Sequence, residues 1–361
     1  MRRIQLSLGL GCLGGFLFVG CLFASLSILS PGWVRAVYAP GPTQVPAATL
    51  VAIVESEQPL PPDITPHPTD ELTPEPTPAP LPTVQGSCGG PQTMTIALLG
   101  MDTRGDDYDY RARTDAIILL RLNFATGRAA MLSIPRDLYV PLPNLEAVGI
   151  DQARINTAYL YGEIYGVSGG GPAEFRQTVE LNFGLRVDRY VLINFSAFKR
   201  VVDAVGGIDV DVPKPIYDAG FPADEGDGTI VFEVPAGIIH MDGATALRYA
   251  RTRHQDDDYH RIKRQQAVLL ALRDKLARPE VIPQIPGLIA AMQGAGRTDL
   301  SPQEIAALAC LGPSINRDSI TSLSIDGTMI LPYTTPTGGR VGIPNRELIA
   351  PLVETFLNST N

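Results

Sequence analysis

Histidine and cysteine are scarce in this chain, which has only four of each among its 361 residues. The cysteines form no CxxC pair, and no HExxH sequence accompanies the histidines. A zinc site needs closely spaced thiolate or imidazole ligands, so both absences argue against a zinc enzyme. The sequence also lacks the GxxxxGKS/T loop that cradles nucleotide phosphates and the GxSxG turn of serine hydrolases. P-loop NTPases and α/β-hydrolases are therefore disfavoured.

Positive charge is outnumbered, because 29 basic residues face 38 acidic ones and the formal net charge is −9. An acidic total argues against a nucleic-acid-binding protein, which would present a basic surface, but it leaves room for a local cluster of arginines. Hydrophobic residues make up 45% of the chain, enough for a sizeable core. The length suits one large domain or two small ones with additional segments.

Residues Ile4–Leu29 contain no charged side chain. At about 1.5 Å per residue this run is long enough to span a hydrocarbon core of about 30 Å. Arg2 and Arg3 precede it, so the positive-inside rule keeps the N-terminus in the cytoplasm. We expect residues 1–38 to form a cytoplasmic stub and an uncleaved, single-pass anchor in the cell membrane, with the rest of the chain outside. A cleaved signal peptide and a lipoprotein processed at Cys21 are the alternatives.

Residues 39–92 contain neither lysine nor arginine, and ten prolines lie between positions 59 and 82. Proline fixes φ and removes a backbone donor, so this composition disfavours helix and sheet. We expect a semi-rigid extracytoplasmic spacer of about 3.1 Å per residue, or plain disorder.

Residues 93–361 are predicted to form one α/β domain with a mixed central sheet covered by helices on both faces. A hairpin turn is expected at Ala125–Gly127, between the second and third strands. The expected strands are Met94–Leu99, Asp115–Leu122, Ala129–Ile134, Arg189–Asn194, Ile208–Val212 and Ile320–Ile325. The expected helices are Ala173–Leu181, a helix capped by Ser196 that ends at Gly206–Gly207, a helix capped by Asp242 that runs to Tyr249, Asp258–Leu276, Gln284–Met292, Pro302–Leu311 and Arg346–Leu357.

Acidic and basic side chains meet at the ends of the first three predicted strands, where α/β domains usually bind ligands. The pairs are Asp102 with Arg104, Arg113 with Asp115, and Arg136 with Asp137. Asp102 and Asp115 are suited to hold Mg²⁺ or Mn²⁺, since magnesium typically takes one or two carboxylates together with phosphate oxygens. A metal-free anion site, or ordinary ion pairs at solvated strand ends, are the alternatives.

A second cluster of arginines lies between Arg248 and Gln266. On the predicted helix Arg261, Arg264 and Gln265 share one face, and Arg251 and Arg253 approach from the preceding segment. Guanidinium groups match phosphate oxygens bidentately and stay charged at physiological pH. The cluster therefore indicates a phosphate or pyrophosphate site, although salt bridges to Asp256, Asp257 and Asp258 would also explain it.

Eight short segments occur in the order seen in the LytR-CpsA-Psr family, which this chain resembles over residues 93–276. They are LLGMDTR (Leu98–Arg104), RTDAIIL (Arg113–Leu119), SIPRD (Ser133–Asp137), INTAY (Ile155–Tyr159), INF (Ile193–Phe195), VGGIDVDV (Val205–Val212), MDGATALRYARTR (Met241–Arg253) and RIKRQQ (Arg261–Gln266). The tail, residues 277–361, has no segment that we can match.

The resemblance implies a transferase that moves a glycopolymer from a polyprenyl-(pyro)phosphate carrier to peptidoglycan. It implies Asp102 and Asp115 as magnesium ligands, with Arg113, Asp115 and Arg136 at the reacting phosphate. The residues implied in binding pyrophosphate are Arg113, Arg136, Arg251, Arg253, Arg264 and Gln265. Asp102 or Asp115 is also a candidate general base. A non-catalytic, lipid-binding or regulatory surface protein of the transcription-attenuator type is the alternative function.

Cys88 and Cys310 are the two cysteines expected on the outer side of the membrane, where disulfides persist. We predict that they are bonded to each other. In the alternative, Cys310 is a small buried side chain and Cys88 a free thiol.

Overall fold

The computed structural model describes residues 87–361 except the segments 104–110, 225–227, 254–257, 279 and 282–295. The predicted anchor, most of the predicted spacer and the helix predicted at Gln284–Met292 lie outside the described residues. Within the described ranges, no helix is both long and apolar enough to cross a membrane.

A six-stranded mixed sheet forms the centre of the described domain, in the order β11-β6-β1-β2-β3-β12. Its strands are β1 (Thr93–Met101), β2 (Thr114–Asn123), β3 (Arg128–Ser133), β6 (Arg189–Ile193), β11 (Gly296–Thr298) and β12 (Thr321–Ser324). The first three form an antiparallel meander, while β6 joins β1 and β12 joins β3 in parallel. The mixed sheet is thus confirmed.

The turn between β2 and β3 lies where the sequence predicts it. The Asn123 side chain accepts hydrogen bonds from the backbone N–H groups of Ala125 at 2.9 Å and Thr126 at 3.0 Å. Gly127 has a φ of 67°, a left-handed conformation that glycine adopts without steric cost. This turn brings β3 back beside β2, so the segment after β3 lies close to the start of β2.

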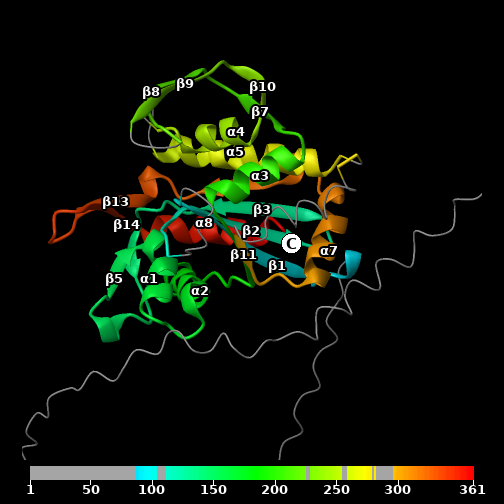
Figure 1. The fold of residues 1–361 in the computed structure, drawn as a ribbon. Coiled ribbons are helices and arrows are strands. Elements are labelled where there is room, and N and C mark those ends of the chain that lie inside the picture. The colour runs from blue at the N-terminus through cyan, green and yellow to red at the C-terminus, as the bar shows by residue number, and fades with distance from the viewer. Residues whose placement is uncertain (1–86, 104–110, 225–227, 254–257, 279, 282–295) are drawn as a thin grey trace, which may run out of the picture. The chain divides into compact units, whose positions relative to one another are not determined.

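Helices cover both faces of the sheet, as predicted (Figure 1). On one face, α1 (Ala158–Ile164), α2 (Gly170–Phe183) and α8 (Arg346–Asn358) pack around a buried cluster that includes Leu119 and Leu132. On the other face, α7 (Pro302–Leu311) packs against Ile96 and Leu122. The long helix α5 (Asp258–Leu276) is also tied to the sheet, because Gln266 donates to Ser133 Oγ and Leu323 O, both at 2.8 Å.

A second layer lies on the same side of the sheet as α5, and its strands lie beyond α5, away from the sheet (Figure 1). It consists of α3 (Phe195–Ala204), β7 (Ile208–Val212), β8 (Ile216–Pro222), β9 (Thr229–Val234), β10 (Gly237–Met241) and α4 (Gly243–Arg251). Two antiparallel pairs, β7–β10 and β8–β9, share a core of their own with α3, α4 and α5. Of these strands the sequence predicted only β7.

Two further hairpins lie beside the sheet: β4 (Tyr139–Pro141) with β5 (Gln152–Arg154), and β13 (Ile330–Thr334) with β14 (Arg340–Pro344). Short 3-10 turns link the elements: η1 (Ser87–Gly89), η2 (Glu146–Val148), η3 (Ile155–Thr157), η5 (Gly312–Ser314), η6 (Arg317–Ser319) and η7 (Gly327–Met329).

The predicted cap of α3 is wrong, whereas that of α4 is confirmed. Asn194, not Ser196, caps α3: it has extended backbone angles and accepts from Ala197 N at 2.8 Å. The helix therefore begins at Phe195, two residues earlier than a cap at Ser196 would place its start. Asp242 caps α4 by accepting from Thr245 N at 2.8 Å.

Cys88 and Cys310 form a disulfide, with 5.7 Å between their Cα atoms, which confirms the predicted bond. The bond joins η1, just before β1, to the last turn of α7. Cys88 has a φ of 65°, in the left-handed region that non-glycine residues rarely adopt.

Candidate active site

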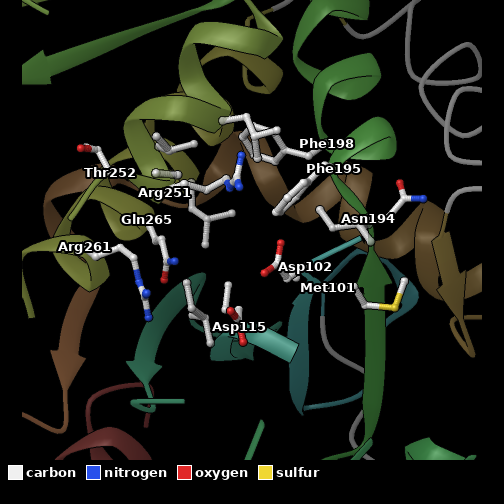
Figure 2. A pocket seen from close by; sticks show the side chains of 18 of the residues that line it. Met101, Asp102, Asp115, Asn194, Phe195, Phe198, Arg251, Thr252, Arg261 and Gln265 are labelled. Atoms are coloured by element: carbon white, nitrogen blue, oxygen red, sulfur yellow. The ribbon is translucent and has the colours of Figure 1, made fainter. Parts of the chain in front are cut away.

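A cavity of about 520 Å³ lies between the central sheet and the helices α3, α4 and α5. Its walls are largely apolar: β1, β2 and β6 contribute Leu98, Ile118 and Val191, and the helices contribute Phe198, Val201, Leu247, Val268, Leu269 and Leu272. Its polar lining comes from strand ends and from the ends of α4 and α5 (Figure 2). One cavity therefore combines a long apolar wall with a charged region.

A β-bulge directs Asp115 into this cavity. Gly100 pairs with Ala116 and Met101 with Thr114, so Asp115 is an extra residue without a partner on β1. In a regular strand Asp115 would lie on the same face as the buried Ile117, opposite to Ala116. The bulge breaks this alternation, and both Asp115 and Ala116 line the cavity.

The Asp115 carboxylate is held by donors from two other segments. Arg136, which follows β3, forms an ion pair with Oδ2. Asn156, in η3, donates from Nδ2 to Oδ1 at 2.9 Å. Since both oxygens are engaged, the orientation of Asp115 is set by protein contacts before any ligand binds.

Asp102 directly follows β1 and is exposed. Its backbone N–H donates to Arg113 O at 3.2 Å, which joins the segments that follow β1 and precede β2. In Figure 2 the carboxylates of Asp102 and Asp115 face the same cavity from neighbouring strands. No group of three or more His, Cys, Asp or Glu side chains in the described part of the chain is arranged to hold a metal. Two carboxylates nevertheless match the ligand set of a magnesium ion that also binds phosphate oxygens.

The basic side of the cavity comes from α4, α5 and the segment between them. The guanidinium carbon of Arg251 lies 4.2 Å from the centroid of the Phe195 ring and 5.4 Å from that of Phe221, within the range of cation–π attraction. Arg261 is only 5% exposed, and it lines the cavity together with Gln265 on α5 (Figure 2). These contacts fix the direction of the cationic groups.

Six of the eight predicted site residues line this cavity: Asp102, Asp115, Arg136, Arg251, Arg253 and Gln265. Two are not among its described lining residues. Arg113 is exposed just before β2, and Arg264 is 6% exposed and donates to the backbone carbonyl of Thr252. Arg264 thus holds the segment that carries Arg251 and Arg253. The catalytic and binding roles of all eight residues stay predictions.

Sequence reasoning assigned no role to several residues of the site. Asn156 and Phe195 lie within the INTAY and INF segments, and membership of these segments was the signal that could have identified them as site residues. Asp218 is 1% exposed, lines the cavity and accepts from Thr252 Oγ1 at 2.6 Å. No signal pointed to Asp218, because the strand that carries it was not predicted.

The family model described as the LytR_cpsA_psr family matches residues 75–338. The chain belongs to this family. It is 34% identical over 236 residues to a protein of Oceanobacillus iheyensis named polyisoprenyl-teichoic acid–peptidoglycan teichoic acid transferase TagU, a match that covers 65% of this chain and 67% of that protein.

The Bacillus subtilis transferase TagV is 33% identical over 220 residues, covering 60% of this chain and 53% of TagV. The chain thus matches about half of the length of TagV. In the comparison of structures, the crystal structure of TagV has a TM-score of 0.59 at 29% identity, over 74% of this chain and 97% of that structure. The structure of TagT bound to LIIa-WTA has a TM-score of 0.56 at 27% identity, over 74% of this chain and 91% of that structure. The mixed α/β fold of this family is therefore shown.

Proposed function

We propose that this protein is a phosphotransferase that moves a glycopolymer from a polyprenyl-(pyro)phosphate carrier to a hydroxyl group of peptidoglycan. The observation that carries this proposal is the cavity itself, which joins a long apolar wall to a cluster of arginines and carboxylates. An isoprenoid chain gains free energy by leaving water, while a pyrophosphate needs fixed cationic donors. The names of the related transferases support the same chemistry.

In the proposed reaction the acceptor hydroxyl oxygen forms a bond to the phosphorus that carries the glycan. The bond from this phosphorus to the bridging oxygen breaks, and polyprenyl phosphate leaves with the electron pair. Arg136, Arg251 and Arg253 hold the phosphate oxygens and stabilise the charge of the transferring group, which is the main contribution of protein to phosphoryl transfer. Asp102 and Asp115 are the candidates to accept the hydroxyl proton.

Asp102 and Asp115 are also the residues that would hold Mg²⁺ or Mn²⁺, because they bring two carboxylates to the phosphate-binding end of the cavity. A bound ion would neutralise charge on the phosphate oxygens. In that arrangement Arg136 keeps Asp115 oriented through its ion pair.

We also propose that the domain works outside the cytoplasmic membrane, anchored within residues 1–38. The charge-free run at Ile4–Leu29 behind Arg2 and Arg3 supports this topology. The Cys88–Cys310 disulfide is consistent with an oxidising compartment.

A transfer assay with the purified full chain tests the proposal. The chain is incubated with a lipid-linked glycan, peptidoglycan and Mg²⁺, and both glycan-bearing peptidoglycan and released polyprenyl phosphate are measured. We expect both products to appear in equal amounts. Tight binding of the lipid-linked glycan without any transfer would contradict the enzymatic proposal and indicate a lipid-binding surface protein instead.

A further inference from the structure

A second cavity, of about 460 Å³, lies beside the segment that carries Arg136. Asp137 and Arg154 line it together with Pro332, Tyr333, Thr334, Arg340 and Val341 of the β13–β14 hairpin. It therefore combines two arginines, a carboxylate, a hydroxyl group and an aromatic ring. This lining differs from the apolar walls of the first cavity.

The hairpin is fastened to the Arg136 segment through its backbone. Leu138 forms an isolated bridge with Gly342, whose N–H donates to Asp137 O at 3.2 Å. On the other side Arg154 Nη2 donates to Arg340 O at 2.9 Å. The rings of Tyr139 and Tyr333 lie 6.2 Å apart between centroids. Backbone and side-chain contacts thus hold the second cavity at a fixed position relative to Arg136.

One carboxylate pairs with an arginine from the lining of each cavity. Asp137 Oδ2 lies 3.4 Å from Arg136 Nε, and its Oδ1 lies 3.2 Å from Arg154 Nε. Arg136 lines the first cavity, and Asp137 and Arg154 line the second. A continuous row of paired charges therefore runs from Asp115 through Arg136 and Asp137 to Arg154.

The lining of the second cavity suits a saccharide. A pyranose ring has an apolar C–H face, which packs on an aromatic ring such as Tyr333, and a rim of hydroxyl groups. Guanidinium donors and a carboxylate acceptor match that rim, and the arginines also match carboxylates carried by the sugar or its substituents. An isoprenoid chain would instead remove water from these charged groups without offering them hydrogen bonds, at a high cost in free energy.

We propose that the second cavity is the subsite for the acceptor glycan, an inference that rests on the proposed function. In phosphoryl transfer the attacking and leaving oxygens lie roughly in line on opposite sides of the phosphorus. The leaving polyprenyl phosphate belongs to the apolar cavity, which Arg136 lines. Asp137, which pairs with Arg136, lines the second cavity, so an acceptor bound there would reach the phosphorus past this pair rather than through the apolar cavity of the leaving group.

Kinetics of the full chain with variants of the hairpin test the subsite. We expect Tyr333→Ala and Arg340→Ala each to raise the KM for peptidoglycan about tenfold, with the KM for the lipid-linked donor and the affinity for polyprenyl phosphate unchanged. Matched controls are Tyr165→Ala, since Tyr165 and Tyr333 are 45% and 40% exposed, and Arg346→Ala, an exposed arginine near Arg340. Thermal melting checks that each variant is folded.

Each alternative has its own result. An unchanged acceptor KM in both variants would overturn the subsite, and a raised KM for the donor alone would overturn it in favour of the donor's glycan. If the wild-type chain transfers nothing, the proposed function fails. The second cavity is then tested by itself, by titrating the chain with a soluble peptidoglycan oligosaccharide. Binding by the wild type that weakens in both variants, but not in the controls, supports a saccharide site; absence of binding overturns it.

Discussion

Asp115 and Arg136 form the pair of residues on which the site depends. They belong to different strand ends, yet the bulge in β2 and the pairing of β2 with β3 bring their side chains together. Asn156 holds the other carboxylate oxygen, so the pair is oriented from three segments. Such preorganisation means that little reorganisation is needed when phosphate charge develops in the transition state.

We predict that Arg136→Ala and Arg251→Ala each lower the rate of transfer by about 10²–10³-fold, the usual effect of removing one donor that stabilises transition-state charge. Each variant should remain folded, which thermal melting checks, although the loss of Arg136 also removes its ion pairs with Asp115 and Asp137. Arg186→Ala is the control, since the Arg186 side chain is 84% exposed. A double variant of Arg136 and Arg251 that retained activity would exclude both residues from the reaction.

We predict that chelation with EDTA stops transfer and that added Mg²⁺ restores it, because Asp102 and Asp115 bring two carboxylates to one cavity. Asp115→Asn should lower both the rate and the dependence of the rate on metal concentration. The measurement is the initial rate of transfer against free Mg²⁺. Full activity in EDTA, together with an inactive Asp115→Asn variant, would identify Asp115 as a general base rather than a metal ligand.

At the residue scale, the sequence predicted the side chains that follow strand ends, such as Asp102 and Arg136, because their positions depend only on where a strand stops. Arg264 lies less directly at the site, and its predicted role in binding stays a prediction. That residue shares the predicted helix face with Arg261 and Gln265, but its side chain bonds to the Thr252 carbonyl and is not among the described residues that line the cavity. Helical spacing identifies residues on one face, whereas the packing of the neighbouring segment decides which of them reach a cavity.

At the scale of elements, α5 and α7 begin and end at the predicted residues. The meander of β1, β2 and β3 was predictable because its apolar runs are interrupted by a turn that Asn123 and Gly127 stabilise. The hairpin β8–β9 was not predicted. Its exposed face carries Tyr217 and Val231, 59% and 56% exposed, so its pattern does not separate an apolar face from a polar one. Tertiary contact with α4 and α5 therefore determines this hairpin more than local sequence does.

Glu174 provides a test of how α2 is packed. Its side chain is buried, and this burial raises the pKa of its carboxyl group, an effect that the hydrogen bond from Asn144 Nδ2 at 2.8 Å opposes. Because the folded-state pKa lies above that of the unfolded chain, ionisation costs free energy in the folded state once the pH exceeds the usual carboxyl range. The cost disappears as the pH falls below that range.

We therefore predict that Glu174→Gln raises the melting temperature at neutral pH and that the gain shrinks toward about pH 4. Melting curves measured across this pH range check the prediction. Glu180→Gln, an exposed residue on the same helix, serves as the control and should leave the pH dependence of melting as in the wild type. A gain that did not vary with pH would show that ionisation of Glu174 is not its source.

At the scale of the whole described domain, the candidate site lies between two cores. One is the core under α7, against which the cavity-lining Leu98 and Val191 pack, and the other belongs to the layer of α3, α4 and β7–β10. The sequence predicted both sides of the site as clusters of charge, but not which residues line the apolar cavity between them. That cavity depends on how the second layer meets the sheet, through side chains far apart in the chain such as Leu98 and Leu269.

The Cys88–Cys310 disulfide joins residues 222 positions apart. We predict that the double variant Cys88→Ser, Cys310→Ser loses about 2–5 kcal/mol of unfolding free energy, because the bond restricts the unfolded chain. Chemical denaturation of the oxidised wild type and the variant measures this loss. In addition, thiol titration of the denatured wild type should detect two fewer thiols before reduction than after it. Equal counts would contradict the bond.

The same disulfide determines how the domain responds to mechanical load. A pull on the chain before Cys88 would otherwise act directly on β1, a central strand that could be peeled from β2 and β6 one hydrogen bond at a time. Because Cys88 is bonded to Cys310, part of that force passes through the sulfur bridge into α7. Tension along the N-terminal part of the chain is therefore shared between β1 and α7, and less of it acts on the strand that leads to Asp102.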